Sequence, residues 1–275
     1  MVWRMLPLLI LTMAMCHAQN GDAAAKAKAP PRSLRLLPLG EAPPFRQEVR
    51  DGVRYELEPA PGSVPPRQVR LGDVETSVLV RLNLGRASEK VRIPAGTEPA
   101  IFREANAPAD SAVKPWLSLN PPEAGDVLAV IWRDPGTRWT QPRSLLFPDS
   151  GAALPAGSIR IVNLLPSEAA LVFDEDRILL PPGKSMVKAI AVGTDLPIQI
   201  AFKTNTGKYQ PFHSSSVLLN PNERAQIFIH RADGEKPRQA AKVVIIPEAA
   251  PPPPKPSHSP ERVPAGATRL SADTR

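Results

Sequence analysis

Apolar residues along most of this chain fall in short runs that are separated by turn residues. Typical runs are Asp126 to Arg133, Ser158 to Leu164 and Lys184 to Ala191, and they are bounded by Pro, Gly, Asn and Asp. Short, closely spaced runs of this kind are typical of the strands of a β-sandwich or barrel. The 35 prolines and 16 glycines exclude long helices. The sequence therefore predicts an all-β protein with two tandem β-sandwich domains, immunoglobulin-like in strand count.

Stretches in the two halves of the chain echo each other. LNPPEAGDVLAVIW (119–132) matches LNPNERAQIFIH (219–230) once two residues are dropped, and a Gly turn and an apolar run follow each. This match favours a tandem duplication. Upstream, VLVRLNL (78–84) resembles SIRIVNL (158–164), but the spacing between the paired segments is unequal. Either the first copy has lost about two strands or the upstream match is accidental.

The segment 44–59 consists of two alternating runs joined by Asp51-Gly52. This dipeptide predicts a β-hairpin, because Gly accepts a positive φ at no steric cost. A two-residue loop would set Val49 opposite Arg54, which puts the apolar residues of the two strands on different faces. We therefore expect a bulge or a longer loop that aligns them.

The first residues have the layout of a cleaved secretory signal. One positive charge at Arg4 precedes an apolar run from Met5 to Met15, and small-residue chemistry ends at Ala18. The run is too short to span a bilayer. Met15 directly precedes Cys16, which argues against a lipoprotein signal, and cleavage after Ala18 removes this cysteine. A mature chain without disulfides points to a bacterial periplasmic or secreted protein.

The two ends of the mature chain differ in composition from its middle. The residues after the signal are rich in Ala, Lys and Pro, and those after Pro247 are rich in Pro, so neither end has enough apolar side chains to form a core. The expected organisation is a signal peptide at 1–18, a flexible leader at 19–32, a hairpin and Pro-rich linker at 33–66, a first sandwich unit at 67–152, a second at 153–248, and a disordered Pro-rich tail at 249–275.

Charge narrows the classes of partner. The formal net charge is +7, but the basic residues are spread along the chain instead of clustering on one element. This distribution is typical of a solvated surface and gives no nucleic-acid footprint. We expect no transmembrane segment in the mature chain, and a partner that is an envelope protein or a glycan.

No motif for catalysis, metal binding or cofactor binding stands up to inspection. Gly183-Lys184-Ser185 lacks the earlier glycine of a phosphate-binding loop, because Ile178 occupies that position. Asp174-Glu175-Asp176 lacks the spacing of a calcium loop. His213 and His230 have no thiolate or paired carboxylate at ligand spacing. We therefore expect no cofactor, no metal site and no enzymatic activity.

Tryptophan is the one feature that suggests a binding surface. Trp132 and Trp139 flank a turn that also carries Arg133 and Arg138. If the two strands pair across this turn, both rings share one face and form a stacking platform for a sugar or a partner side chain. The competing interpretation is that the tryptophans anchor a sandwich core.

Together these features favour an exported, non-enzymatic binding or assembly module of the cell envelope. The first alternative is a carbohydrate-binding protein that uses the tryptophan face of the first unit. The second alternative is an enzyme whose site is assembled from scattered residues that carry no recognisable motif.

Overall fold

The computed structural model describes most of the chain between Arg32 and Pro252, and all of these residues lie in strands, turns or loops, with no helix. The expected signal peptide, the leader before Arg32 and the tail from residue 253 lie outside the described residues. The described ranges are 32–72, 77–94, 98–103, 114–173, 175–234 and 237–252.

The strands of the first half form two four-stranded sheets. We call them inner sheet 1 and outer sheet 1. In spatial order, inner sheet 1 contains β10 (Arg143–Pro148), β9 (Gly125–Trp132), β1 (Arg32–Leu39) and β6 (Val91–Arg92). Outer sheet 1 contains β5 (Val78–Arg81), β4 (Gln68–Leu71), β7 (Ala100–Arg103) and β8 (Leu117–Ser118).

The second half repeats this arrangement with inner sheet 2 and outer sheet 2. Inner sheet 2 contains β18 (Ala241–Ala249), β17 (Glu223–Arg231), β11 (Ser158–Asn163) and β14 (Ser185–Ala189). Outer sheet 2 contains β13 (Asp176–Leu180), β12 (Ala169–Phe173), β15 (Leu196–Lys203) and β16 (Tyr209–Val217). A separate two-stranded sheet contains β2 (Gln47–Arg50) and β3 (Val53–Glu56).

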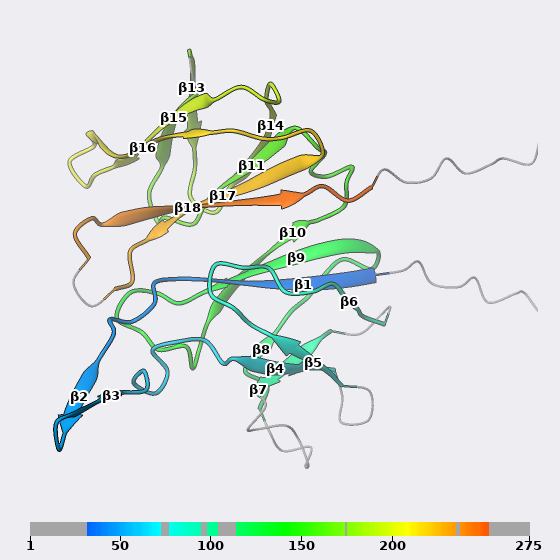
Figure 1. Cartoon of the computed structure of the whole chain (residues 1–275). Coiled ribbons are helices and arrows are strands. Elements are labelled where there is room, and N and C mark those ends of the chain that lie inside the picture. Colours follow the sequence, from blue (N-terminus) through cyan, green and yellow to red (C-terminus); the bar gives the residue numbers. More distant parts are fainter. Residues whose placement is uncertain are drawn as a thin grey trace, which may run out of the picture.

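The four large sheets stack in four layers, with the two inner sheets face to face (Figure 1). One apolar cluster fills each sandwich, and a third lies between the inner sheets, where Leu37, Leu128, Val130, Val162 and Phe228 are buried. Each such side chain contributes about 1.5–3 kcal/mol through burial. The expected all-β fold built of sandwiches is confirmed, and the two sandwiches share a packed interface.

Burial on both faces explains the composition of the inner strands. All six residues of β11 are buried, as are seven of the eight residues of β1. Strands covered on both sides carry nearly continuous apolar runs instead of an alternating pattern. The inner sheets also contain the parallel pairs β1–β9 and β11–β17.

Both units have the same strand order, which supports a duplication. β1, β6, β9 and β10 in the first unit take the places of β11, β14, β17 and β18 in the second. The stretches 119–132 and 219–230 therefore match because both lead into the equivalent strands β9 and β17. The upstream match was wrong, because residues 78–84 contain β5 of an outer sheet. The true counterpart of SIRIVNL (158–164) is SLRLLPL (33–39).

This equivalence moves the start of the first unit from residue 67 to β1. β1 is the central partner of β9 and β6, so the sandwich is incomplete without it. The first unit has also lost no strands. Instead, residues 40–67 between β1 and β4 form a long insertion where the second unit has only the short connection 164–168. Immunoglobulin domains pack strands ABED on CFG, so the resemblance to them is limited to the sandwich architecture.

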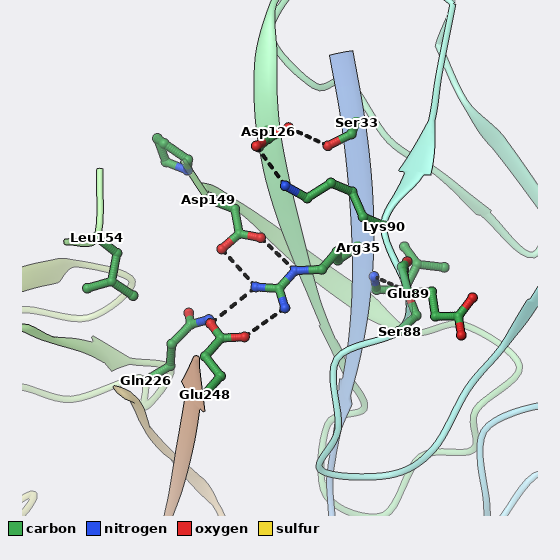
Figure 2. Close-up of polar contacts among 12 residues, drawn as sticks. Ser33, Arg35, Ser88, Glu89, Lys90, Asp126, Asp149, Leu154, Gln226 and Glu248 are labelled. Carbon is green, nitrogen blue, oxygen red and sulfur yellow. Dashed lines mark hydrogen bonds and ion pairs between the residues drawn. The ribbon is translucent and has the colours of Figure 1, made fainter. Parts of the chain in front are cut away.

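A buried ionic network joins the two inner sheets. The Arg35 guanidinium lies between Asp149 and Glu248, with Nε 2.6 Å from Asp149 Oδ2 and Nη1 2.7 Å from Glu248 Oε2 (Figure 2). From the other sheet, Arg224 Nη2 lies 2.8 Å from Asp149 Oδ1 and 3.0 Å from Glu248 Oε1. Burial alone would raise the pKa of Glu248, but hydrogen bonding and the positive charges of Arg35 and Arg224 hold it below its usual value.

The network contains equivalent residues from both copies. Arg35 and Arg160 occupy the same position in SLRLLPL and SIRIVNL, and Asp149 and Glu248 both follow a proline at the end of the last strand. Arg160 has no carboxylate partner at hydrogen-bond distance among the described residues. Its Nη2 donates to the carbonyl of Pro148 at 2.5 Å, and its guanidinium lies 5.7 Å from the centre of the Phe147 ring. Burial lowers the pKa of Arg160.

Asp149→Asn should strongly destabilise the protein, because it removes a charge that neutralises two buried guanidinium groups. The Asp149 side chain is only 1% exposed. Breaking a buried pair of this kind costs about 3–5 kcal/mol. The control is Asp134→Asn in the exposed pair with Arg143, which should cost about 1 kcal/mol or less. Urea unfolding of both variants measures the difference, and equal losses would contradict the role of the network.

Candidate functional site

The structure separates the two tryptophans that were expected to share a face. Trp139 is fully buried in the core of the first sandwich, whereas Trp132 is half-buried at the interface between the inner sheets. Trp139 precedes β10, and the residue opposite Trp132 is Arg143. The predicted two-ring platform was therefore wrong, because the chain between β9 and β10 turns inward at Trp139 before the next strand begins.

Trp139 also anchors neighbouring loops through its backbone. Its carbonyl accepts hydrogen bonds from Trp116 Nε1 at 2.6 Å and from Arg103 Nη2 at 2.8 Å. Its amide donates to the carbonyl of Gly62 at 2.8 Å. Gly62 has a positive φ of 76°, and the Arg138 side chain packs directly against it. Trp139 thus acts as a core residue that fixes the end of the insertion 40–67.

The two arginines expected beside the tryptophans, Arg133 and Arg138, make contacts within the fold. Arg133 Nε lies 2.9 Å from Asp233 Oδ2 and links the two units, while Arg138 is exposed over Gly62. The arginine that contacts Trp132 is Arg143, which lies opposite it on β10 and whose guanidinium is 5.8 Å from the centre of the Trp132 ring.

Trp132 lines a cleft between the two units. The cleft has a volume of about 570 Å³, and its walls come from β9 and β10 on one side and from the loops after β11 and β13 on the other. A neighbouring hollow of about 530 Å³ shares Leu165, Pro166 and Arg231 with it. The residues that line the cleft at Trp132 come from distant parts of the chain, so no local sequence signal could have revealed it.

Replacing the two tryptophans should have very different effects on stability. Trp139→Ala should cost about 3–5 kcal/mol, because it removes a buried ring and leaves a cavity. Trp132→Ala should cost clearly less, because its ring is partly exposed in the cleft. Thermal or urea unfolding of the single variants makes the comparison. Equal losses would show that Trp132 is as essential to packing as Trp139.

The most exposed apolar surface of the described chain lies on the hairpin of β2 and β3, which we call the arm (residues 44–59). Figure 1 shows the arm projecting from the stacked sheets. It exposes Phe45 (64%), Val49 (63%), Val53 (52%), Tyr55 (49%) and Leu57 (39%). β2 and β3 pair with each other, and among the described residues neither pairs with a strand outside the arm.

The hairpin prediction was right, but the expected bulge or longer loop was wrong. Val49 lies opposite Arg54 across a two-residue loop, in which Asp51 and Gly52 have φ values of 51° and 78°. Two positive φ values define a type I′ turn. Aligning the apolar residues is unnecessary because neither face of the arm is buried against the body. Residues directly opposite share a face, so Val53, Tyr55 and Leu57 lie on one face and Phe45 and Val49 on the other.

The base of the arm is held firmly at both ends. Before it, the Glu41 amide donates to Asp233 Oδ1 at 2.7 Å, and Glu41 Oε2 accepts from the amides of Asp233 and Gly234. Glu41 also pairs with Lys242. After the arm, the carbonyl of Gly62 accepts a hydrogen bond from the amide of Trp139. The arm therefore projects from a rigid base although its own surface is uncovered.

Beside this base lies His230, a buried titratable group. Its Nδ1 donates to the carbonyl of Arg231 at 2.8 Å, and its Nε2 has no partner among the described residues. Burial lowers the pKa of His230 below its usual 6.5, although the Arg231 hydrogen bond and the charges of Asp233 and Glu41 act to raise it, while Lys242 lowers it. The ring is therefore held neutral in the folded state.

His230 should make the protein less stable in mild acid. A histidine whose pKa is lowered in the folded state takes up a proton more readily when the protein unfolds. The free energy of unfolding is therefore highest above the ordinary pKa of 6.5, and it falls as the pH drops from 6.5 toward the lowered pKa of the folded state. The unfolding free energy should fall between about pH 7 and about pH 5, and His230→Gln should flatten this slope. An unchanged slope in this variant would contradict the assignment. Burial also lowers the pKa of His213, so His213 contributes to the slope in the same direction, and His213→Gln measures its share.

Two further kinds of site concern the described part of the chain, a metal-binding cluster and a membrane-spanning helix. No three His, Cys, Asp or Glu side chains gather there in a group that could hold a metal ion. No helix among these residues is long and apolar enough to cross a membrane.

Comparison with known proteins adds little to this geometry. No family model matches the chain, and no curated protein matches it. Among solved structures, the chain is similar to a DUF3823 family protein from Bacteroides ovatus ATCC 8483, with 13% identity over 70% of this chain and 100% of that one, and a TM-score of 0.17. A likeness at this level supports no inference about site or function.

Proposed function

We propose that this protein is an exported, non-enzymatic binding or assembly module of the bacterial cell envelope, and that the arm is its working surface. The observation that carries the proposal is the set of large apolar side chains left uncovered on the two faces of the arm. Exposed apolar patches on a folded protein mark interaction sites.

The comparison between the two units supports this proposal. Both build their sandwiches from equivalent strands, yet only the first carries the insertion that contains the arm. The arm contributes no residue to the three apolar clusters. An isolated two-stranded hairpin is marginally stable in water, and its unpaired edges invite pairing with another chain. Such a segment is best explained by a partner that covers it.

Export and the lack of catalysis rest on the sequence. The layout of residues 1–18 supports a secretory signal, and the chain offers no recognised constellation of nucleophile, base or cofactor-binding loop. The carbohydrate alternative retains only Trp132 in the cleft, and Arg143 already lies over that ring. One partly covered ring is a weaker platform than the exposed apolar side chains of the arm.

Removing the arm should release the protein from its partner without unfolding it. The test variant replaces residues 46–57 with a Gly/Ser linker and keeps Glu41 and Gly62, which anchor the base. A control variant, Leu179→Ser with Val187→Ser, removes exposed apolar side chains from the second unit. Full-length protein made in its native host is fractionated, and the amount sedimenting with the envelope is measured.

We expect envelope retention to fall about tenfold or more in the arm variant, because loss of apolar anchors typically costs about 2 kcal/mol or more. The control variant should be retained like the wild type, and both should melt within a few degrees of it. Equal retention of the arm variant and the wild type would contradict the proposal.

A further inference from the structure

No strand among the described residues pairs with the outer edge of β3, and the register of the hairpin shows which backbone groups this edge presents. The Leu57 amide donates to the carbonyl of Arg46 at 3.0 Å, so these two residues form a hydrogen-bonded pair. Hydrogen-bonded and non-hydrogen-bonded pairs alternate along antiparallel strands. Tyr55 therefore directs its backbone groups toward β2, and Arg54 and Glu56 direct theirs outward. The outer edge offers two amides and two carbonyls to another strand.

The residues along this edge are complementary to themselves. In the order Val53-Arg54-Tyr55-Glu56-Leu57, a basic and an acidic residue flank the central tyrosine, and an apolar residue follows on each side. We propose that the partner of the arm is a second copy of this chain, and that two β3 strands pair antiparallel about Tyr55. This inference rests on the proposed function of the arm as a working surface.

The proposed register pairs every side chain with a suitable neighbour. Arg54 of each copy lies opposite Glu56 of the other, and Val53 lies opposite Leu57. The Arg54–Glu56 positions are the hydrogen-bonded pairs, so the outward amides and carbonyls of both copies are satisfied at once. Opposite charges and apolar residues in direct cross-strand positions stabilise a sheet.

The pairing also brings the apolar residues of the two copies together on one face. Val53, Tyr55 and Leu57 share one face of the arm, and antiparallel pairing places the same three residues of the second copy beside them. The result is a four-stranded sheet in the order β2–β3–β3–β2 with a continuous apolar strip at its centre. Three or more strands with an apolar face have the independent stability that a single hairpin lacks.

Two other edge strands, β2 and β14, lack this complementarity. On β2, pairing about Glu48 would set two glutamates against each other and Arg46 against Arg50. On the edge strand β14, pairing about Val187 would set Lys188 against Met186. The charge pattern of β3 is therefore not a general property of the edge strands of this protein.

The test exchanges charges across the proposed pairs and measures mass by sedimentation equilibrium of the full mature chain. The wild type should form a dimer. Arg54→Glu and Glu56→Arg should each weaken self-association about tenfold or more, because each places like charges opposite one another twice. An equimolar mixture of the two variants should restore the dimer, since glutamates on one copy then face arginines on the other. The double variant R54E/E56R should also dimerise.

Arg50→Glu is the matched control, because it makes the same charge change on β2, away from the pairing edge. It should dimerise like the wild type, and circular dichroism should show all variants folded. A monomeric wild type, or single variants that fail to recover the dimer when mixed, would overturn self-pairing. Monomeric wild type with arm-dependent envelope retention would overturn self-pairing alone. Reciprocal dimerisation without envelope retention would support self-pairing and contradict the envelope function.

Discussion

The fold depends on burying both faces of the two inner sheets at once. Each inner sheet packs against its own outer sheet and against the other inner sheet, so its central strands have no solvent-facing side. Charged groups that enter this layer need opposite charges or hydrogen bonds there, because an isolated buried charge is very costly. The cluster of Arg35, Asp149, Arg224 and Glu248 meets this requirement with residues from both units. The two sandwiches are thereby joined in a fixed register.

The repeated strand order of the two units explains why the interface has this form. Equivalent sheets face each other, and equivalent residues, such as Asp149 and Glu248, meet within one network, as in the self-complementary interfaces of symmetric dimers. Departures from equivalence then become informative. The second unit joins its first two strands by a short connection, whereas the first unit extends the arm between them. The stacked sheets form the rigid body of the protein. The arm projects from this body and carries apolar residues that its packing does not use.

The arm and the inter-unit cleft represent two kinds of candidate surface. The cleft is lined by Trp132 and by loops from both units, and its polar groups are partly engaged with one another, as in the Arg143–Asp134 pair. The arm has uncovered apolar side chains on both faces and an unpaired backbone edge. Physical chemistry favours the arm as the site of association, because covering it satisfies hydrogen bonds and removes apolar surface from water together.

The sequence by itself determined the all-β class, the Asp51-Gly52 hairpin and the repeat between 119–132 and 219–230, because these depend on local turn chemistry and on short-range pattern. It did not place β1, since a strand buried on both faces has no alternating pattern to mark it. Only the tertiary structure decided that Trp139 is core while Trp132 lines a cleft, because burial depends on which distant segments cover a residue. It likewise decided that the apolar faces of the arm need not align, since the apolar side chains on both faces stay exposed.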